Sequence, residues 1–144
     1  MGVDAQIEAE DGRSIERLDD PQGSMVKFFV MVDADATACL RFIDPYGDTV
    51  FNSLQLPVLE AEVEVRLPTL DISRLRADRE HQLAEAVRVG WQATVIEALR
   101  EGLGDAASDA EELQAVKAHV SQVLELIGRA RGAGARTYLR FIGD

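Results

Sequence analysis

The chain has 144 residues and a mass of 15.8 kDa, the size of one typical domain, and 47% of its residues are hydrophobic, enough for an ordinary core. Its formal net charge is −11, from 26 acidic and 15 basic side chains, and a field of that sign repels nucleic-acid phosphates and anionic lipid heads. We therefore expect a single domain over residues 1–144 that binds neither nucleic acid nor a membrane. Its charge either attracts cations and a basic protein partner or only keeps the protein soluble.

The single cysteine, Cys39, excludes an internal disulfide and a cysteine-rich zinc site. Its apolar neighbours predict a buried thiol rather than a nucleophile. No run approaches the ~18–20 apolar residues of a membrane helix, and the acidic N-terminal segment is unlike a signal or transit peptide. These features predict a cytoplasmic protein, and they leave open whether it forms a homo-oligomer.

The first third of the chain carries strand signals. Apolar and polar residues alternate over residues 3–10, Asp11-Gly12 is a strong hairpin signal, and residues 13–18 would return as a second strand. The apolar run 25–32 is too short to assign by periodicity; its Val and Phe content favours a strand, with a short helix as the alternative. Residues 37–43 are predicted to form a central strand, with residues 49–51 able to pair back.

Residues 56–67 fit two patterns. Their apolar residues alternate with Glu60, Glu62 and Glu64, which favours a strand with all three carboxylates on one face. Pro57 suits the first turn of a helix instead, and the leucines and valines also occur at helical spacing. In a helix the three glutamates would be scattered around the axis.

The second half carries helix signals. Asp71 can cap a helix whose apolar residues recur at i, i+4 spacing through Trp91, which we expect in the core, until the glycines at 102 and 104 end it. Residues 108–111 (Ser-Asp-Ala-Glu) form a capping box for a second helix with an apolar face over residues 113–127. Residues 137–142 form a closing strand.

Strands, then two helices, then a strand predict an α+β fold. We expect a mainly antiparallel sheet with an N-terminal hairpin, two long helices packed on one face, and a C-terminal strand that returns to the sheet centre.

The turn at residues 43–49 (Ile-Asp-Pro-Tyr-Gly-Asp-Thr) is the strongest candidate site. Pro45, Gly47 and one aspartate suffice for a turn, so the second aspartate of the pair Asp44 and Asp48 exceeds the minimum, as does Tyr46, and surplus polar residues on a loop often carry function. The simpler interpretation is that Asp44 caps the turn, Asp48 begins the next element and Tyr46 packs on the end of the sheet. We favour that interpretation, because Asp and Gly are first of all turn residues.

Leu-Arg-Phe-Ile occurs twice, at residues 40–43 and 139–142, each time followed by a carboxylate. If the two segments were neighbouring parallel strands, Asp44, Asp48 and Asp144 would meet at one end of the sheet. Clustered carboxylates there would bind a hard cation or hold a proton. If the strands were antiparallel or apart, this cluster would not form.

These same residues resemble a family of small bacterial proteins without an assigned activity. Its members open with Met-Gly-(Val/Leu)-Asp, share an Ile-Asp-Pro-Tyr-Gly-Asp-Thr-x-Phe-Asn block and end in Tyr-Leu-(Lys/Arg)-Phe-Ile-Gly-Asp; here these are residues 1–4, 43–52 and 138–144. The resemblance brings no catalytic residue, cofactor or partner. It implies a helix after the Phe-Asn pair. Asn52, the last residue of the central block, is also a candidate binding residue.

No phosphate-binding loop, nucleophile elbow or zinc-protease motif is present, and no cofactor is expected. Neither His81 nor His119 has a partner at i+4 spacing, so we expect no metal ligand there. The first hypothesis is therefore a non-enzymatic acidic module that binds a basic protein, as an inhibitor or immunity protein does. The second is a cation-dependent enzyme or ligand-binding protein with its site at Asp44, Tyr46, Asp48 and Asp144.

Overall fold

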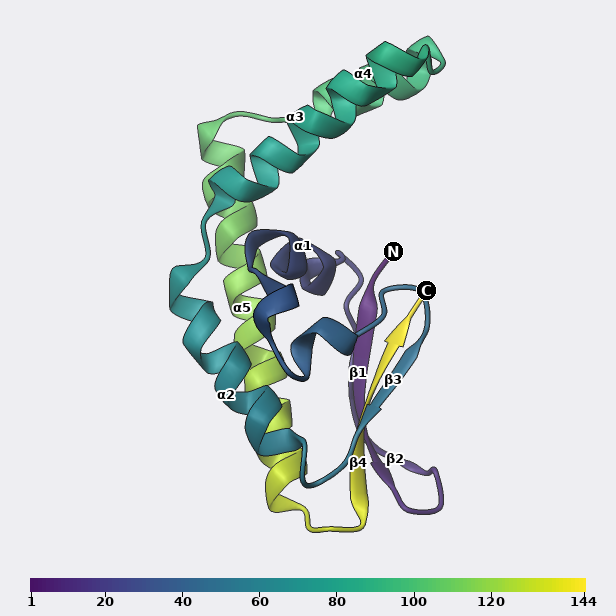
Figure 1. The fold of residues 1–144 in the computed structure, drawn as a ribbon, viewed down its shortest axis with the longest axis vertical. Coiled ribbons are helices and arrows are strands. Elements are labelled where there is room, and N and C mark those ends of the chain that lie inside the picture. The colour runs from purple at the N-terminus through teal and green to yellow at the C-terminus, as the bar shows by residue number, and fades with distance from the viewer.

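A computed structural model describes residues 1–144. Four strands form one sheet, and the helices that pack on it lie on the same side (Figure 1). We call the sheet and these packed helices the body. The strands are β1 (Val3–Ala9), β2 (Ser14–Leu18), β3 (Asp48–Phe51) and β4 (Thr137–Gly143). The helices are α1 (Ser24–Met31), α2 (Leu56–Arg66), α3 (Ile72–Val89), α4 (Ala93–Glu101) and α5 (Ala106–Gly132), with short 3-10 turns η1 (Ala34–Ala36), η2 (Leu40–Phe42) and η3 (Leu67–Thr69).

The sheet is antiparallel throughout, in the order β2-β1-β4-β3. The N-terminal hairpin lies at one edge, and the C-terminal strand β4 lies between β1 and β3, with Ala5 opposite Phe141 and Thr49 opposite Phe141 on the other side. The predicted α+β class, the hairpin and the central C-terminal strand are thus confirmed.

The core lies between the sheet and α5, which contacts three of the strands. Val120, Val123 and Ile127 of α5 are fully buried, as the predicted apolar face requires. The helices α1 and α2 pack against α5, and the other long helix, α3, contacts α1 and α5 before it extends past the end of the sheet (Figure 1). The helix layer therefore covers one face of the sheet, and the other face is polar.

Residues 24–31 form helix α1, so the preference for a strand there was wrong. The carboxylate of Asp20 accepts hydrogen bonds from the backbone N–H groups of Ser24 and Met25, at 2.7 and 3.0 Å, and thereby caps the helix. Met25, Phe28 and Met31 are buried at a spacing of three residues, which is helical.

The central strand predicted at residues 37–43 is also wrong, because this segment forms irregular structure and the 3-10 turn η2. The Glu62 carboxylate accepts hydrogen bonds from the N–H groups of Ala38, Cys39 and Leu40, at 2.6 to 3.1 Å. Backbone donors that a strand would use in a ladder are therefore satisfied by one side chain from α2. The repeated Leu-Arg-Phe-Ile consequently forms a strand only in its second copy.

Residues 56–66 are helix α2, as the resemblance implied. The three glutamates are scattered, as expected for a helix: Glu60 pairs with Arg131 at 2.7 Å, Glu62 holds the preceding segment and Glu64 is exposed. Asn52 accepts hydrogen bonds from Leu54 and Gln55 just before the helix starts.

The helix predicted to run from Asp71 to residue 101 is two helices. Asp71 caps α3 by accepting from Ser73, as predicted, but Gly90 adopts a left-handed conformation (φ +77°) and ends it. The chain then reverses into α4, so the i, i+4 stripe does not stay on one helix face. Trp91 is 56% exposed, and its predicted place in the core is wrong.

The N-cap residue of helix α5 lies three residues before the predicted N-cap, Ser108. This cap is Asp105, whose carboxylate accepts from the Ser108 N–H at 2.9 Å while the Ser108 hydroxyl lies 3.3 Å from the Asp105 N–H. Ser108 is therefore the third helical residue rather than the cap. The box exists, shifted by one turn.

Candidate functional site

The turn at residues 44–48 is held rigidly against the C-terminus of β4. Asp44 accepts a hydrogen bond from the Tyr46 N–H at 2.9 Å, and its own N–H donates to the Thr49 hydroxyl, which in turn donates to the Phe42 carbonyl. The Gly143 N–H donates to the Gly47 carbonyl at 2.9 Å. Asp44 thus caps the turn and Asp48 begins β3, as the simpler interpretation predicted.

The structure brings Asp44, Tyr46, Asp48 and Asp144 to the same end of the sheet, through antiparallel rather than parallel pairing of β3 and β4. Their carboxylates nevertheless take separate partners. Asp144 accepts from the Gly2 N–H at 2.6 Å, Asp48 lies 3.0 Å from an Arg140 guanidinium nitrogen, and Asp44 caps the turn. No group of three or more His, Cys, Asp or Glu side chains is arranged to hold a metal ion.

Asn52 is not part of this constellation. It follows the last residue of β3, at the opposite end of that strand from Asp48. Its side chain accepts a hydrogen bond from the Leu54 N–H, just before α2 begins. The candidate set from the sequence is therefore brought together at four positions, and the fifth serves the start of a helix.

Tyr46 projects from the turn into solvent with 73% of its surface exposed, and does not pack on the sheet end. Phe42, on the same segment, is 60% exposed, with the Arg41 guanidinium 4.7 Å from its ring centre. Two exposed aromatic rings on one ordered segment are unusual for a surface that binds no partner. The turn contacts explain why Asp44 is there, but they leave the phenol without a structural role.

The polar face of the sheet carries a buried ion pair that sequence reasoning missed. Glu8, only 6% exposed, accepts from Arg140 at 2.6 Å, and Arg140 also reaches Asp48. Burial alone would raise the pKa of Glu8, but hydrogen bonds from Arg140 and Gln6 outweigh it and lower the pKa overall. Glu8 and Arg140 lie on the neighbouring strands β1 and β4, at positions where the alternation of apolar and polar residues points the side chain away from the core. That alternation is the sequence signal that could have paired them.

A second buried carboxylate, Asp20, lines a polar hollow of about 300 Å³ together with His119. Asp20 accepts from three backbone N–H groups, those of Val3, Ser24 and Met25. The His119 Nε2 is buried without a hydrogen-bond partner, 3.7 Å from an Asp20 oxygen. Asp20 therefore joins the start of β1 to the start of α1.

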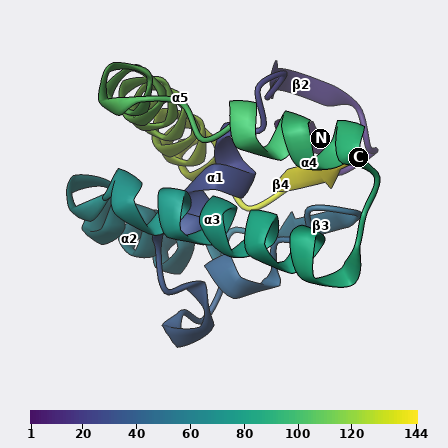
Figure 2. The same cartoon turned by 90° about the horizontal axis from the view of Figure 1, so that it is seen from above.

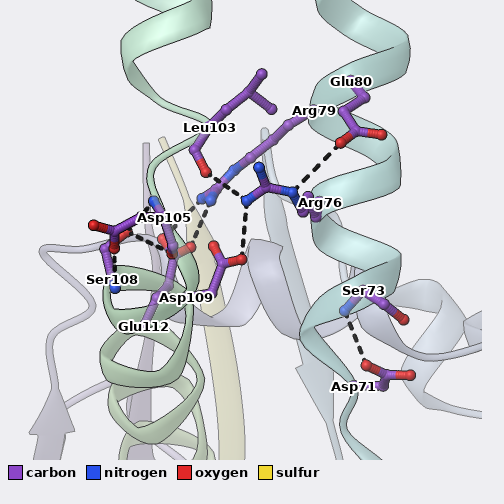
Figure 3. A network of polar contacts seen from close by, with 10 residues as sticks. All are labelled: Asp71, Ser73, Arg76, Arg79, Glu80, Leu103, Asp105, Ser108, Asp109 and Glu112. Atoms are coloured by element: carbon purple, nitrogen blue, oxygen red, sulfur yellow. Dashed lines mark hydrogen bonds and ion pairs between the residues drawn. The ribbon is translucent and has the colours of Figure 1, made fainter.

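A cluster of ion pairs clamps α3 to the start of α5 (Figure 3). Arg79 donates two hydrogen bonds to Glu112, at 2.5 and 2.8 Å, and Arg76 reaches both Asp109 and the Leu103 carbonyl at 3.0 Å. Lys27 of α1 also pairs with Glu112 at 3.1 Å. We call this set of contacts the clamp. It fixes the direction in which the rest of α3 leaves the body.

Cys39 is free and buried, as predicted. Burial, and then the charge of Glu62, raise the pKa of its thiol, so little thiolate forms. This favours the packing role expected from the sequence over a nucleophilic one.

Comparison of the chain with protein-family models, with curated proteins and with solved structures found no match. The resemblance of the three sequence blocks to small bacterial proteins therefore stays a prediction. None of the helices combines the length and the apolar character needed to cross a bilayer.

Proposed function

We propose that this protein is a non-enzymatic, cytosolic binding module of the inhibitor or immunity kind, and that the turn at residues 44–48 docks a basic protein. The observation that carries the proposal is Tyr46: its ring is 73% exposed on a turn whose backbone is fixed by hydrogen bonds to Asp44 and β4. Tyr is enriched among the residues that dominate binding energy at protein interfaces.

The rigidity of the turn supports this function. A loop that is already ordered loses little conformational entropy when a partner binds, so more of the contact energy appears as affinity. Tyr46 and Phe42 would supply apolar area, and the tyrosine hydroxyl would supply a polar contact at the rim.

Charge supports a basic partner. Asp44, Asp48 and Asp144 lie at the same end of the sheet, on a chain whose net charge is −11. Such a surface speeds encounters with a positively charged protein and disfavours acidic ones. Association of this kind weakens as salt screens the charges.

The contacts of the carboxylates favour protein binding over a cation site. A cation such as Ca²⁺ needs several oxygens around one point. Here Asp44 is engaged with the turn, Asp48 with Arg140 and Asp144 with Gly2.

The test is capture from a native extract on immobilised wild-type protein, Tyr46→Ala and Leu54→Ala. Leu54 is 84% exposed and lies outside the turn, so its variant is the matched control. We expect a basic protein on the wild-type and Leu54→Ala columns at low salt, much less of it on Tyr46→Ala, and its release as salt rises. Equal capture by Tyr46→Ala, or capture insensitive to salt, would contradict the proposal.

A further inference from the structure

Beyond the clamp, residues 81–102 form a helical hairpin that projects from the body (Figures 1 and 2). We call this hairpin the arm. It consists of the end of α3 and all of α4, which turn back on each other at Gly90. Gly90 comes eleven residues after Arg79, and each helical residue adds about 1.5 Å, so the arm extends ~16 Å beyond the clamp. Ala86 is the only buried residue of the arm.

The arm exposes large apolar side chains at its end. Trp91 is 56% exposed, Val87 51%, Val89 49% and Val95 38%. A slot of about 220 Å³ lies between the two helices, lined by the apolar Ala86, Trp91 and Leu99 and by the polar His81, Gln82 and Glu85. Two antiparallel helices cannot bury each other's outward faces, and helical hairpins normally complete a bundle with further helices. The end of the arm thus exposes several large apolar side chains of the kind that partners cover at interfaces.

The charge of the arm differs from that of the body. Residues 81–102 contain three carboxylates and two guanidinium groups, a net charge of −1, which leaves −10 of the chain's −11 on the remaining residues. Four of these five groups are paired within the arm, Glu85 with Arg88 and Glu97 with Arg100. A basic partner is therefore steered to the body, whereas the nearly neutral arm presents exposed apolar side chains that a strongly acidic protein can approach.

We propose that the arm associates with the arm of a second copy of this chain, so that two hairpins form a four-helix contact about a two-fold axis. An identical copy brings an equally apolar and nearly neutral surface, which makes the contact self-complementary. The arm also keeps the two acidic bodies apart: when the two hairpins lie side by side, the bodies are separated by about one arm length, ~16 Å, which is about twice the Debye length of ~8 Å at physiological ionic strength. Repulsion between the bodies is then largely screened.

This association is independent of the proposed docking at the turn. It is tested by sedimentation velocity of the full chain from low micromolar to near-millimolar concentration. The expected mass rises from 15.8 kDa towards twice that value. Because the contact is apolar and the bodies repel, high salt should leave the dimer unchanged or strengthen it, whereas binding of a basic protein at the turn should weaken.

Val87→Glu and Trp91→Glu should both be monomeric over the same range, with unchanged far-ultraviolet circular dichroism. Val87 is exposed and lies outside the slot, and Glu is a better helix former than Val, so this variant keeps its fold. Leu54→Glu places the same charge on an exposed leucine outside the arm and should dimerise as the wild type does. A wild-type chain that stays monomeric at every concentration, or a dimer that persists in folded Val87→Glu and Trp91→Glu, would overturn the proposal.

Discussion

Gly143 in β4 lies directly against the backbone of Pro45: a Cβ atom at position 143 would be 2.4 Å from the Pro45 carbonyl. The contact joins the end of the C-terminal strand to the turn that carries Tyr46. Gly143 and the next residue add hydrogen bonds: the Gly143 N–H donates to the Gly47 carbonyl, and the Asp144 carboxylate accepts from the Gly2 N–H. Both chain ends and the turn therefore form one unit.

Gly143→Ala should push the turn away from β4, because the clash is with backbone atoms that cannot rotate aside. We expect a loss of ~1–3 kcal/mol in the free energy of unfolding, the usual cost of overpacking. Gly128→Ala is the control: it is exposed in α5, its nearest neighbour would be 3.6 Å away, and it should gain ~0.5–1 kcal/mol. Urea unfolding measures both, and equal effects would show that the contact does not matter.

Asp20→Ala should be among the most destabilising single substitutions. It leaves the N–H groups of Val3, Ser24 and Met25 without their acceptor, and each buried orphan costs ~1–3 kcal/mol. We therefore expect a loss of ~3 kcal/mol or more by urea unfolding. Asp19→Ala removes only an exposed ion pair with Arg17 and should cost less than ~1 kcal/mol. Similar losses for the two variants would refute this role for Asp20.

The clamp should weaken in acid. Hydrogen bonds from Arg79, and then from Lys27, hold the pKa of Glu112 below its ordinary value of 4.5. Because the folded pKa is the lower one, this stabilisation is complete above pH ~4.5 and is lost as the pH falls through the folded pKa.

The melting temperature of wild-type protein should thus exceed that of Glu112→Gln by a constant amount near neutrality, and the gap should close in acid. A gap that widens as the pH falls below 4.5 would mean that the pKa of Glu112 is raised instead.

Divalent cations should leave the melting temperature unchanged. A ligand that binds only the native state must raise it, and the carboxylates of the turn already have separate partners. The measurement compares EDTA with Mg²⁺, Ca²⁺, Mn²⁺ and Zn²⁺ in turn. A selective rise of several degrees that Asp48→Asn abolishes would establish a cation site in place of the protein-docking surface.

Local signals in the sequence were sufficient where the chain uses its own neighbours. The hairpin of β1 and β2, strand β4 and the buried face of α5 follow from alternation, Asp11-Gly12 and helical spacing. The position of Asp44 and Asp48 at the ends of the turn also followed from turn chemistry.

The failures arise from contacts that are distant in sequence or from single backbone conformations. Residues 37–43 have the pattern of a strand, but the carboxylate of Glu62, more than twenty residues further along the chain, accepts hydrogen bonds from the N–H groups of residues 38–40. The stripe through Trp91 looks like one buried helix, but the left-handed Gly90 reverses the chain. Tyr46 is exposed because the turn is held by backbone and Asp44 contacts that do not involve its ring.

The most direct test of the proposed function replaces Tyr46 with a photoreactive phenylalanine analogue and irradiates the protein in a native extract at low and high salt. We expect a covalent adduct with a basic protein that forms at low salt and diminishes at high salt. The same analogue at Leu54 should give little of that adduct. Adducts that form equally from both positions, or none from position 46 at low salt, would contradict docking at this turn.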